Sequence, residues 1–144
     1  VLVLDTSGPD PWIGVQPQAI AAVALVAKKD PDLDFKSLMC LSGVDAHDNL
    51  EVVYHLHSLT HRHKIVLKVS VPKADPVTVS VVGVWRGADW YERECWDLFG
   101  VRFEGHPDLR RLLLPEDWVG HPLRKEYVFP TEYNGIDNTR DYSV

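Results

Sequence analysis

The sequence predicts an α+β fold of two layers, in which helices pack on one face of a mixed or antiparallel sheet and the C-terminal part wraps around the outside. Residues 50–58 and 64–71 alternate apolar and polar side chains with a period of two, which is typical of strands with one buried face. Residues 88–99 carry apolar side chains at helical spacing. Pro and Gly are frequent from Gly105 onward, which favours an extended segment that runs over the surface.

The N-terminal part predicts one helix. Residues 1–17 mix Gly, Pro and Asp, and we expect them to be irregular. Residues 18–29 predict a helix, because apolar residues recur at helical spacing and two lysines stand in the last turn, where cations suit the helix macrodipole. The dipeptide Asp30-Pro31 ends this helix, since the residue before a proline disfavours helical geometry.

The middle of the chain predicts the sheet. Residues 35–44 predict a strand that Gly43 and the polar run 45–49 bring to an end. The two alternating strands that follow are joined by the short link 59–63, which favours a hairpin. The alternation places Val52, Tyr54, Leu56, Ile65, Leu67, Val69 and Val71 on the buried face, and Val53, His55, His57, Lys64, Val66, Lys68 and Ser70 on the other.

The second half predicts one more helix and a long irregular segment. Residues 77–85 are apolar and β-branched, and they fit a strand or a short helix equally well. The helix over residues 88–99 presents an apolar stripe of Ala88, Tyr91, Cys95, Leu98 and Phe99, and Gly100 suits its C-terminal cap. Residues 101–103 add a possible strand. We expect one domain over residues 1–130 and an extended polar tail over residues 131–144.

Composition excludes several classes of protein. A chain of 144 residues that is 45% hydrophobic suits one globular domain, and a net charge of -6 argues against non-specific binding of nucleic acid. The longest apolar run, residues 19–27, is too short to span a bilayer, which needs about 20 residues. Cys40 and Cys95 are predicted to be buried thiols in a reducing cytosol, and their spacing supports neither an iron–sulfur cluster nor a Cys-based zinc site.

Four histidines form the first candidate for chemistry. His55, His57, His61 and His63 fall on or beside the predicted hairpin, where pairs on one face could ligate zinc or nickel. The alternative is a solvated sheet face with the imidazole rings in water. We favour this alternative, because no carboxylate or thiol stands at a supporting spacing.

The acidic helix is the second candidate. Glu94 and Asp97 lie three residues apart, on one helix face near Glu92 and Arg93, and two carboxylates could act as acid and base or bind a cation. The alternative is a network of salt bridges with nearby arginines. We favour this network, whose candidate cations are Arg102, Arg110, Arg111 and Arg124.

The segment after this helix is the third candidate. His106 stands beside Asp108, as an oriented base would, but no serine, cysteine or threonine is placed as a nucleophile. Gly105 and Pro107 favour a fixed turn. Arg110 and Arg111, which follow this turn, could form bidentate ion pairs with carboxylates of this chain or of a partner. The second half is also rich in aromatic residues, which fit a protein interface and a small core equally well: Trp85, Trp90, Trp96, Phe99, Phe103, Trp118, Tyr127 and Phe129.

One long run of the sequence is far more specific than these patterns. The residues that carry it are Glu92, Arg93, Glu94, Asp97, Phe99, Gly100, Phe103, Gly105, His106, Pro107, Asp108, Arg110, Arg111, Trp118, Pro122, Leu123, Arg124 and Lys125. Residues 91–127 resemble the signature of the C-subunit family of NADH-quinone oxidoreductase, whose members are small subunits of the peripheral arm of respiratory complex I. The hairpin of residues 45–71 also resembles this family.

The resemblance implies a structural role. Members of this family carry no cofactor of their own, and NAD, FMN, iron–sulfur clusters and quinone belong to partner subunits of the complex. They pack against the D subunit, which helps to form the quinone site, on the cytoplasmic side of the bacterial plasma membrane. The motif residues are then expected to fix the fold and to dock, with no catalytic residue among them. Two alternatives stay open: the equivalent subunit of an energy-converting hydrogenase or formate hydrogenlyase, and a stand-alone metal-binding enzyme that uses the histidines.

Overall fold

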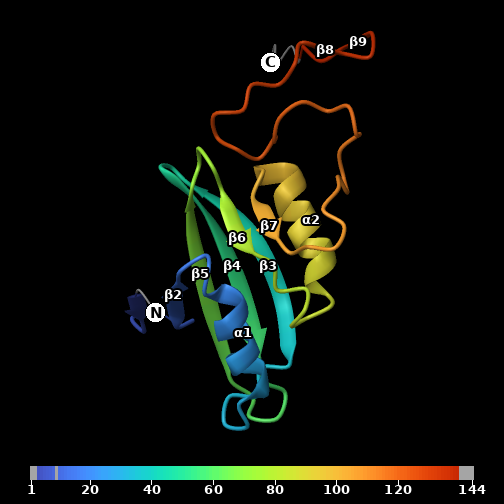
Figure 1. Ribbon diagram of the computed structural model, residues 1–144. Helices are drawn as coiled ribbons and strands as arrows, with labels where there is room; N and C mark the ends of the chain where they lie inside the picture. The colour runs from blue at the N-terminus through green and yellow to red at the C-terminus, as the bar shows by residue number, and fades with distance from the viewer. Residues whose placement is uncertain (1–2, 9, 140–144) are drawn as a thin grey trace.

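The computed structural model describes residues 3–8 and 10–139 of the chain. Within these residues it has the helices α1 (Ile20–Lys29) and α2 (Ala88–Phe99), and the strands β1 (Val3–Asp5), β2 (Trp12–Val15), β3 (Ser37–Ala46), β4 (Asn49–His57), β5 (Lys64–Pro72), β6 (Val77–Val79), β7 (Arg102–Glu104), β8 (Glu132–Tyr133) and β9 (Ile136–Asp137). Both helices lie on the same side of the main sheet, so the fold has two layers (Figure 1). The predicted α+β fold is confirmed.

The main sheet has five strands in the order β1-β2-β5-β4-β3. The pair β2–β5 is parallel and all other neighbours are antiparallel, so the sheet is mixed. Two smaller pairs complete the fold, a parallel one between β6 and β7 and an antiparallel one between β8 and β9. The β8–β9 pair lies at the end of the molecule that carries the C-terminus, away from the main sheet (Figure 1).

The hydrophobic core lies between the main sheet and the two helices. The alternation in β4 and β5 gives the predicted inward face, and Val52, Tyr54 and Leu56 are fully buried there. Ile20, Ala24 and Ala27 of α1 and Ala88 and Cys95 of α2 belong to the same buried cluster. The outward face is less exposed than predicted, because Val53 and Val66 on this face are buried.

Several sequence predictions need correction. Residues 1–17, expected to be irregular, include β1 and β2, which are too short for a local pattern. Pairing fixes them, since β2 pairs with β5 and β1 pairs with β2. Residues 77–85 combine a three-residue strand with turns, so neither a full strand nor a helix describes them. The polar tail contains the β8–β9 pair up to Asp137, and its last five residues lie outside the described part. Cys95 is buried as expected, whereas Cys40 is only half-buried.

Gly43 does not end its strand, because β3 continues through it to Ala46. A side chain at this position would collide with α2: a Cβ atom would lie 2.5 Å from Cδ2 of Phe99 and 3.0 Å from Sγ of Cys95. The glycine therefore allows close approach of α2 to the edge of the sheet. This contact fixes the position of the helix that carries several of the motif residues.

No helix within residues 3–8 and 10–139 is long and apolar enough to cross a lipid bilayer.

Candidate docking site

Three polar side chains of α2 point into the protein. Glu92, Arg93 and Asp97 are all buried, although charged residues normally lie on the exposed face of a helix. Glu94, in contrast, is exposed. The acid–base alternative for Glu94 and Asp97 is therefore not supported, since the Asp97 carboxylate is in the interior and Glu94 faces solvent.

Glu92 joins α2 to the turn after β6. Its carboxylate accepts hydrogen bonds from the Ser80 hydroxyl and from the Val81 backbone N–H, each at 2.7 Å. Burial raises the pKa of Glu92 to about 7, in spite of these two donors. No arginine reaches this carboxylate within the described residues, so the expected salt-bridge network does not include it.

Asp97 holds the start of a long irregular segment, which we call the strap (residues 105–131). Its Oδ2 accepts the backbone N–H groups of Leu112, Leu113 and Leu114 at 3.0, 2.8 and 2.9 Å, and its Oδ1 accepts Nη1 of Arg111 at 2.7 Å. Burial alone would raise the pKa of Asp97, but these donors outweigh it and hold the pKa below the ordinary value. Both oxygen atoms of the Asp97 carboxylate thus accept hydrogen bonds from groups of its own chain.

Two arginines bind the backbone of the strap. Arg111 also donates to the carbonyl oxygens of Trp118 and Gly120, at 2.7 and 3.3 Å. Arg93 donates to the carbonyl oxygens of Arg110 and Arg111, at 3.3 Å each. A segment without regular structure needs such side-chain donors, because its backbone groups have few partners of their own.

The C-terminal end of α2 anchors the middle of the strap. Gly100 caps the helix in the left-handed region, with φ of 78°, as the sequence predicts. Arg124 Nε donates to the Phe99 carbonyl at 2.7 Å, and His121 Nδ1 donates to the Asp97 carbonyl at 2.9 Å. The last turn of a helix leaves carbonyl oxygens without partners, and the strap satisfies them.

Asp45, at the end of β3, forms a second anchor that was not predicted from the sequence. Its carboxylate pairs with Lys73 at 2.8 Å and accepts the backbone N–H of Lys125 at 2.9 Å, while Lys73 also pairs with Glu126. The Lys73 ammonium and then the Lys125 N–H lower the pKa of Asp45 to about 2. The sequence does contain a signal for this anchor, an aspartate at an inward position of a strand. A carboxylate that is buried there needs hydrogen-bond donors or a cation from elsewhere in the chain.

His106 is a turn-fixing residue in this structure. Its side chain is buried, its Nδ1 accepts the backbone N–H of Asp108 at 3.0 Å, and its Nε2 donates to the Asp89 carbonyl at 3.3 Å. Asp108 pairs with Arg110 at 2.7 Å instead of with the imidazole. Both ring nitrogens are therefore used for local structure, and the oriented-base interpretation has no support.

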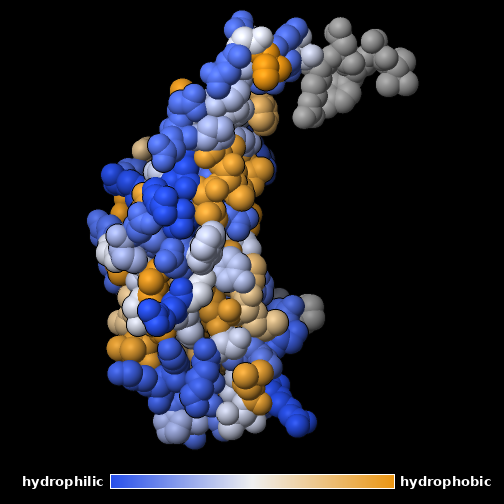
Figure 2. All heavy atoms as spheres, turned by 90° about the vertical axis from the view of Figure 1, so that its right-hand side faces the viewer, coloured by the Kyte–Doolittle hydropathy of each residue, from blue (hydrophilic) through white to orange (hydrophobic). Residues whose placement is uncertain are grey.

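The strap exposes several apolar side chains, although some of its polar side chains bind the body of the protein. Its exposed apolar residues are Leu113, Val119, Leu123, Val128 and Phe129, of which Val119 and Val128 are each 84% exposed. Figure 2 looks at the side on which α2 lies in Figure 1, and hydrophobic residues gather there below the C-terminal end. The aromatic residues divide between two roles, since Trp85 and Phe103 belong to the core while Trp90 and Phe129 are exposed.

The motif residues thus occupy different surroundings. Those whose side chains bind the body or the strap are Glu92, Arg93, Asp97, His106, Arg111 and Arg124. Phe103 packs in the core, and Phe99 is partly buried against it. Gly105, Pro107, Asp108, Arg110, Leu123 and Lys125 are exposed, and Trp118 and Pro122 are half-buried.

Two of the four histidines near the hairpin bind the backbone of another segment. His61 and His63 donate from Nε2 to the carbonyl oxygens of Pro31 and Leu33, at 2.8 and 2.7 Å, and so tie the β4–β5 turn to the segment after α1. His55 lies on the outward sheet face. Across residues 3–8 and 10–139, no group of three or more His, Cys, Asp or Glu side chains is placed to hold a metal ion.

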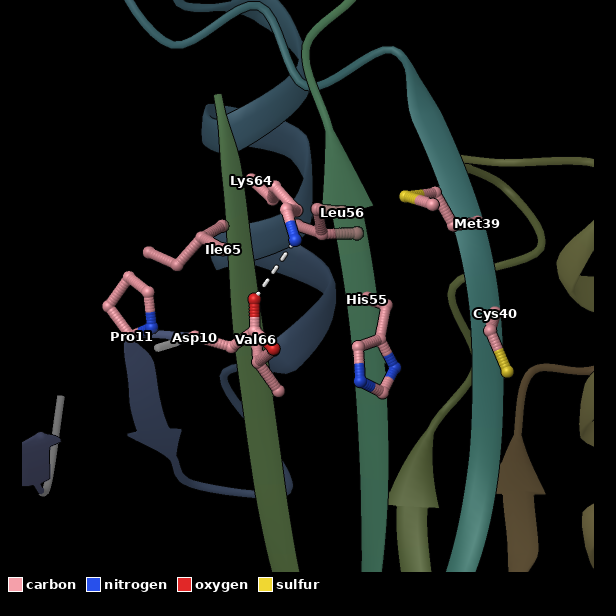
Figure 3. Close-up of a pocket in the computed structure, with 9 residues that line it drawn as sticks. All are labelled: Asp10, Pro11, Met39, Cys40, His55, Leu56, Lys64, Ile65 and Val66. Carbon is pink, nitrogen blue, oxygen red and sulfur yellow. Dashed lines mark hydrogen bonds and ion pairs between the residues drawn. The ribbon is translucent and has the colours of Figure 1, made fainter. Parts of the chain in front are cut away.

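A hollow of about 330 Å³ crosses the outward face at His55. Figure 3 shows side chains from β3, β4 and β5 around it, with the ion pair between Lys64 and Asp10 at one side. Met39, Cys40 and Val66 contribute much of its lining. One imidazole and one solvent-exposed ion pair do not form a convergent set of catalytic groups, so the hollow does not compete with the strap as the candidate site.

Comparison with known proteins identifies the family. Residues 13–133 match the family described as respiratory-chain NADH dehydrogenase, 30 kDa subunit. A relative from Chloroherpeton thalassium, which is named as the C subunit of NADH-quinone oxidoreductase, is 50% identical over 117 residues, which cover 80% of this chain and 49% of the relative. A relative of the same name from Acidothermus cellulolyticus is 47% identical over 141 residues, covering 90% of this chain and 73% of the relative. The chain therefore spans about half the length of the first relative.

Solved structures show the same fold. A chain described as Nqo5, a trypsin-resistant fragment, superposes with a TM-score of 0.66 at 29% identity, covering 74% of this chain and 89% of that one. A chain of the membrane-bound sulfane sulfur reductase, an archaeal respiratory membrane complex, has a TM-score of 0.67 at 21% identity and covers 88% of this chain and 76% of its own, which is a similarity of fold alone. Because the family match runs through the sheet, α2 and the strap, this chain belongs to the 30 kDa subunit family of respiratory-chain NADH dehydrogenase, which includes the C subunits of NADH-quinone oxidoreductase.

Proposed function

We propose that this chain is a structural, non-redox subunit of the peripheral arm of an NADH-quinone oxidoreductase, and that it docks through the strap on the quinone-site (D) subunit. The observation that carries the proposal is the orientation of the strap. Its backbone and the side chains of Arg111 and Arg124 are held by α2 and Asp45. Val119, Val128 and Phe129, in contrast, face solvent. A segment that exposes its apolar residues in this way is typical of a protein interface.

The buried charges of α2 support a positioning role. Asp97 and Arg93 of α2 bind strap groups, and Arg111 of the strap binds both Asp97 and the strap backbone, so these side chains set the path of the strap across the body of the protein. Electron transfer and quinone reduction need donors and acceptors at fixed distances. A strap fixed to α2 and the sheet holds a bound partner in one position relative to the sheet. A partner that binds only this arrangement of the strap also stabilises it.

The family relationship supports the choice of complex. Three relatives bear the name of the C subunit, and the chain spans between half and three quarters of their length. On this proposal NAD, FMN, iron–sulfur clusters and quinone are bound by the partner subunits. The chain would lie on the cytoplasmic side of the bacterial plasma membrane, held there by the complex.

Affinity purification of the tagged, full-length protein from membranes tests the proposal. We expect the quinone-site subunit and the flavin- and cluster-binding subunits to be recovered, as identified by mass. Recovery with a nickel-containing subunit instead would assign the chain to a hydrogenase-type complex. Recovery of the chain alone with a stoichiometric metal, or turnover by the isolated chain, would contradict the structural role.

A further inference from the structure

The strand β3 forms a long free edge of the main sheet. It has ten residues and pairs only with β4, whereas the opposite edge strand β1 has three. In the described part of the chain, no other strand pairs with the outer side of β3. The one hydrogen bond that reaches its backbone from α2 is donated by the Tyr91 hydroxyl to the Met39 carbonyl, at the irregular position near the start of the strand.

This edge lacks the features that usually prevent pairing with another chain. Proteins protect edge strands with lysines, prolines, bulges or short length. The segment Ser37–Ala46 contains no lysine, arginine or proline, and its bulge lies between Leu38 and Cys40, away from the central residues. Its one charged residue, Asp45, is buried in the ion pair with Lys73. Residues 40–44 therefore present an unprotected strand edge.

A groove of about 240 Å³ runs between this edge and α2. Its lining includes Ser42 and Gly43 of β3, Tyr91, Glu94 and Leu98 of α2, and Leu123 of the strap. Within the described residues Glu94 makes no ion pair and no side-chain hydrogen bond, unlike the other two carboxylates of this helix turn, Glu92 and Asp97. A single unpaired carboxylate beside an apolar groove complements a segment that carries one cation.

We propose that an extended segment of a neighbouring subunit adds to β3 as a further antiparallel or parallel strand, with a lysine or arginine paired to Glu94. This deepens the docking role proposed above and rests on it. Leu123 is 52% exposed and lies both in the groove and on the strap, so the edge and the strap form one continuous surface. Backbone pairing along β3 would give binding, and Glu94 would select the register of the added strand.

Hydrogen exchange on the assembled complex and on the isolated chain tests the pairing. We expect amides within residues 40–44 that do not bond to β4 to exchange about tenfold more slowly in the complex, because a second strand would bind them. A photo-crosslinking side chain at Val44 should attach to one extended segment of a single neighbouring subunit. The same probe at Leu25, on α1, is the matched control. Unchanged exchange at residues 40–44 would overturn the proposal.

Charge reversal separates this inference from the strap docking. Glu94→Lys should lower recovery of the complex about fivefold while the isolated chain keeps its thermal midpoint, because Glu94 is exposed. Glu104→Lys, an exposed residue of β7, is the control and should assemble normally. Normal assembly of Glu94→Lys, together with failure of strap variants to assemble, would contradict the strand addition and leave the strap docking intact.

Discussion

Asp97 of α2 and Arg111 of the strap are joined by a 2.7 Å ion pair whose carboxylate is completely buried. The pair does more than bring two charges together, because Asp97 also accepts three consecutive backbone N–H groups and Arg111 also donates to two carbonyl oxygens of the strap. The two side chains thus supply hydrogen bonds that the strap backbone would otherwise make in a helix or a sheet. They explain how a segment of this length keeps one path without a helix or a paired strand.

Removing the cation of this pair should loosen the strap. Arg111→Ala leaves the buried Asp97 carboxylate without a cation, held by three backbone N–H groups alone, and we expect the free energy of unfolding to fall by about 3 kcal/mol. Urea unfolding measures this loss, and limited proteolysis should show faster cleavage within the strap. Arg111→Lys is the matched variant: it keeps the charge but loses the forked geometry, so it should lie between wild type and Arg111→Ala. Wild-type stability and cleavage for Arg111→Ala would contradict this role.

Glu92 should make the protein less stable as the pH rises. Its pKa is about 7 in the folded protein against an ordinary value of 4.5, so the folded state binds more protons between these two pH values. The free energy of unfolding should therefore fall from about pH 4.5 to about pH 7, by about 3 kcal/mol. Glu92→Gln should remove this slope, as measured by urea unfolding across the pH range. Glu116→Gln, an exposed control, should keep it; a slope unchanged in Glu92→Gln would be evidence against the assignment.

Asp45 should act in the opposite direction at lower pH. Its pKa is about 2 in the folded protein, below the ordinary value of 3.8, because Lys73 and the Lys125 N–H bind the carboxylate. The stabilisation is present above pH 3.8 and is lost as the pH falls toward 2. Asp45→Asn should be less stable at neutral pH and should lose part of this acid sensitivity, whereas Asp48→Asn on the neighbouring turn should behave as wild type. The check is thermal unfolding between pH 2 and pH 5.

Gly43 should not tolerate a side chain. In Gly43→Ala the new Cβ would lie 2.5 Å from Phe99, so α2 must shift, and we expect a loss of about 1–3 kcal/mol in the free energy of unfolding. Gly83→Ala is the control, because no heavy atom lies within 4 Å of its added Cβ. Thermal unfolding of both variants measures the difference. Equal stability of the two would show that α2 does not depend on close approach to β3.

The sequence predicts the elements whose pattern is local. The period of two in β4 and β5 gives both their boundaries and their buried face. The apolar spacing in α2 gives its boundaries, and Gly100 marks its end, but only Ala88 and Cys95 of the predicted apolar stripe are fully buried. Short strands such as β1 and β2 cannot be predicted from a local pattern, because they form through pairing with other strands of the sheet. Gly43 is misleading for the same reason: its role is set by Phe99, which is far away in the sequence.

The candidate site could be predicted as a set of residues but not as a set of contacts. The acidic helix and the four arginines are visible in the sequence, yet among the residues that the structure describes only Asp97 and Arg111 form the expected salt bridge. Arg124 binds the Phe99 carbonyl, and Arg110 and Arg102 pair with Asp108 and Asp75. Which polar side chains turn inward depends on how α2 is rotated against the sheet. That rotation is a tertiary property, and it also decides that Glu94 faces solvent while Glu92 does not.

The central claim is that the exposed apolar residues of the strap dock this subunit into its complex. The most direct measurement is recovery of the assembled complex with the double variant Val128→Asp, Phe129→Asp, compared with Leu25→Asp, Val26→Asp on α1. We expect the strap variant to keep the unfolding midpoint of the isolated chain and to reduce recovery about tenfold or more, because charges would enter the apolar interface. Normal recovery with the strap variant would contradict the claim.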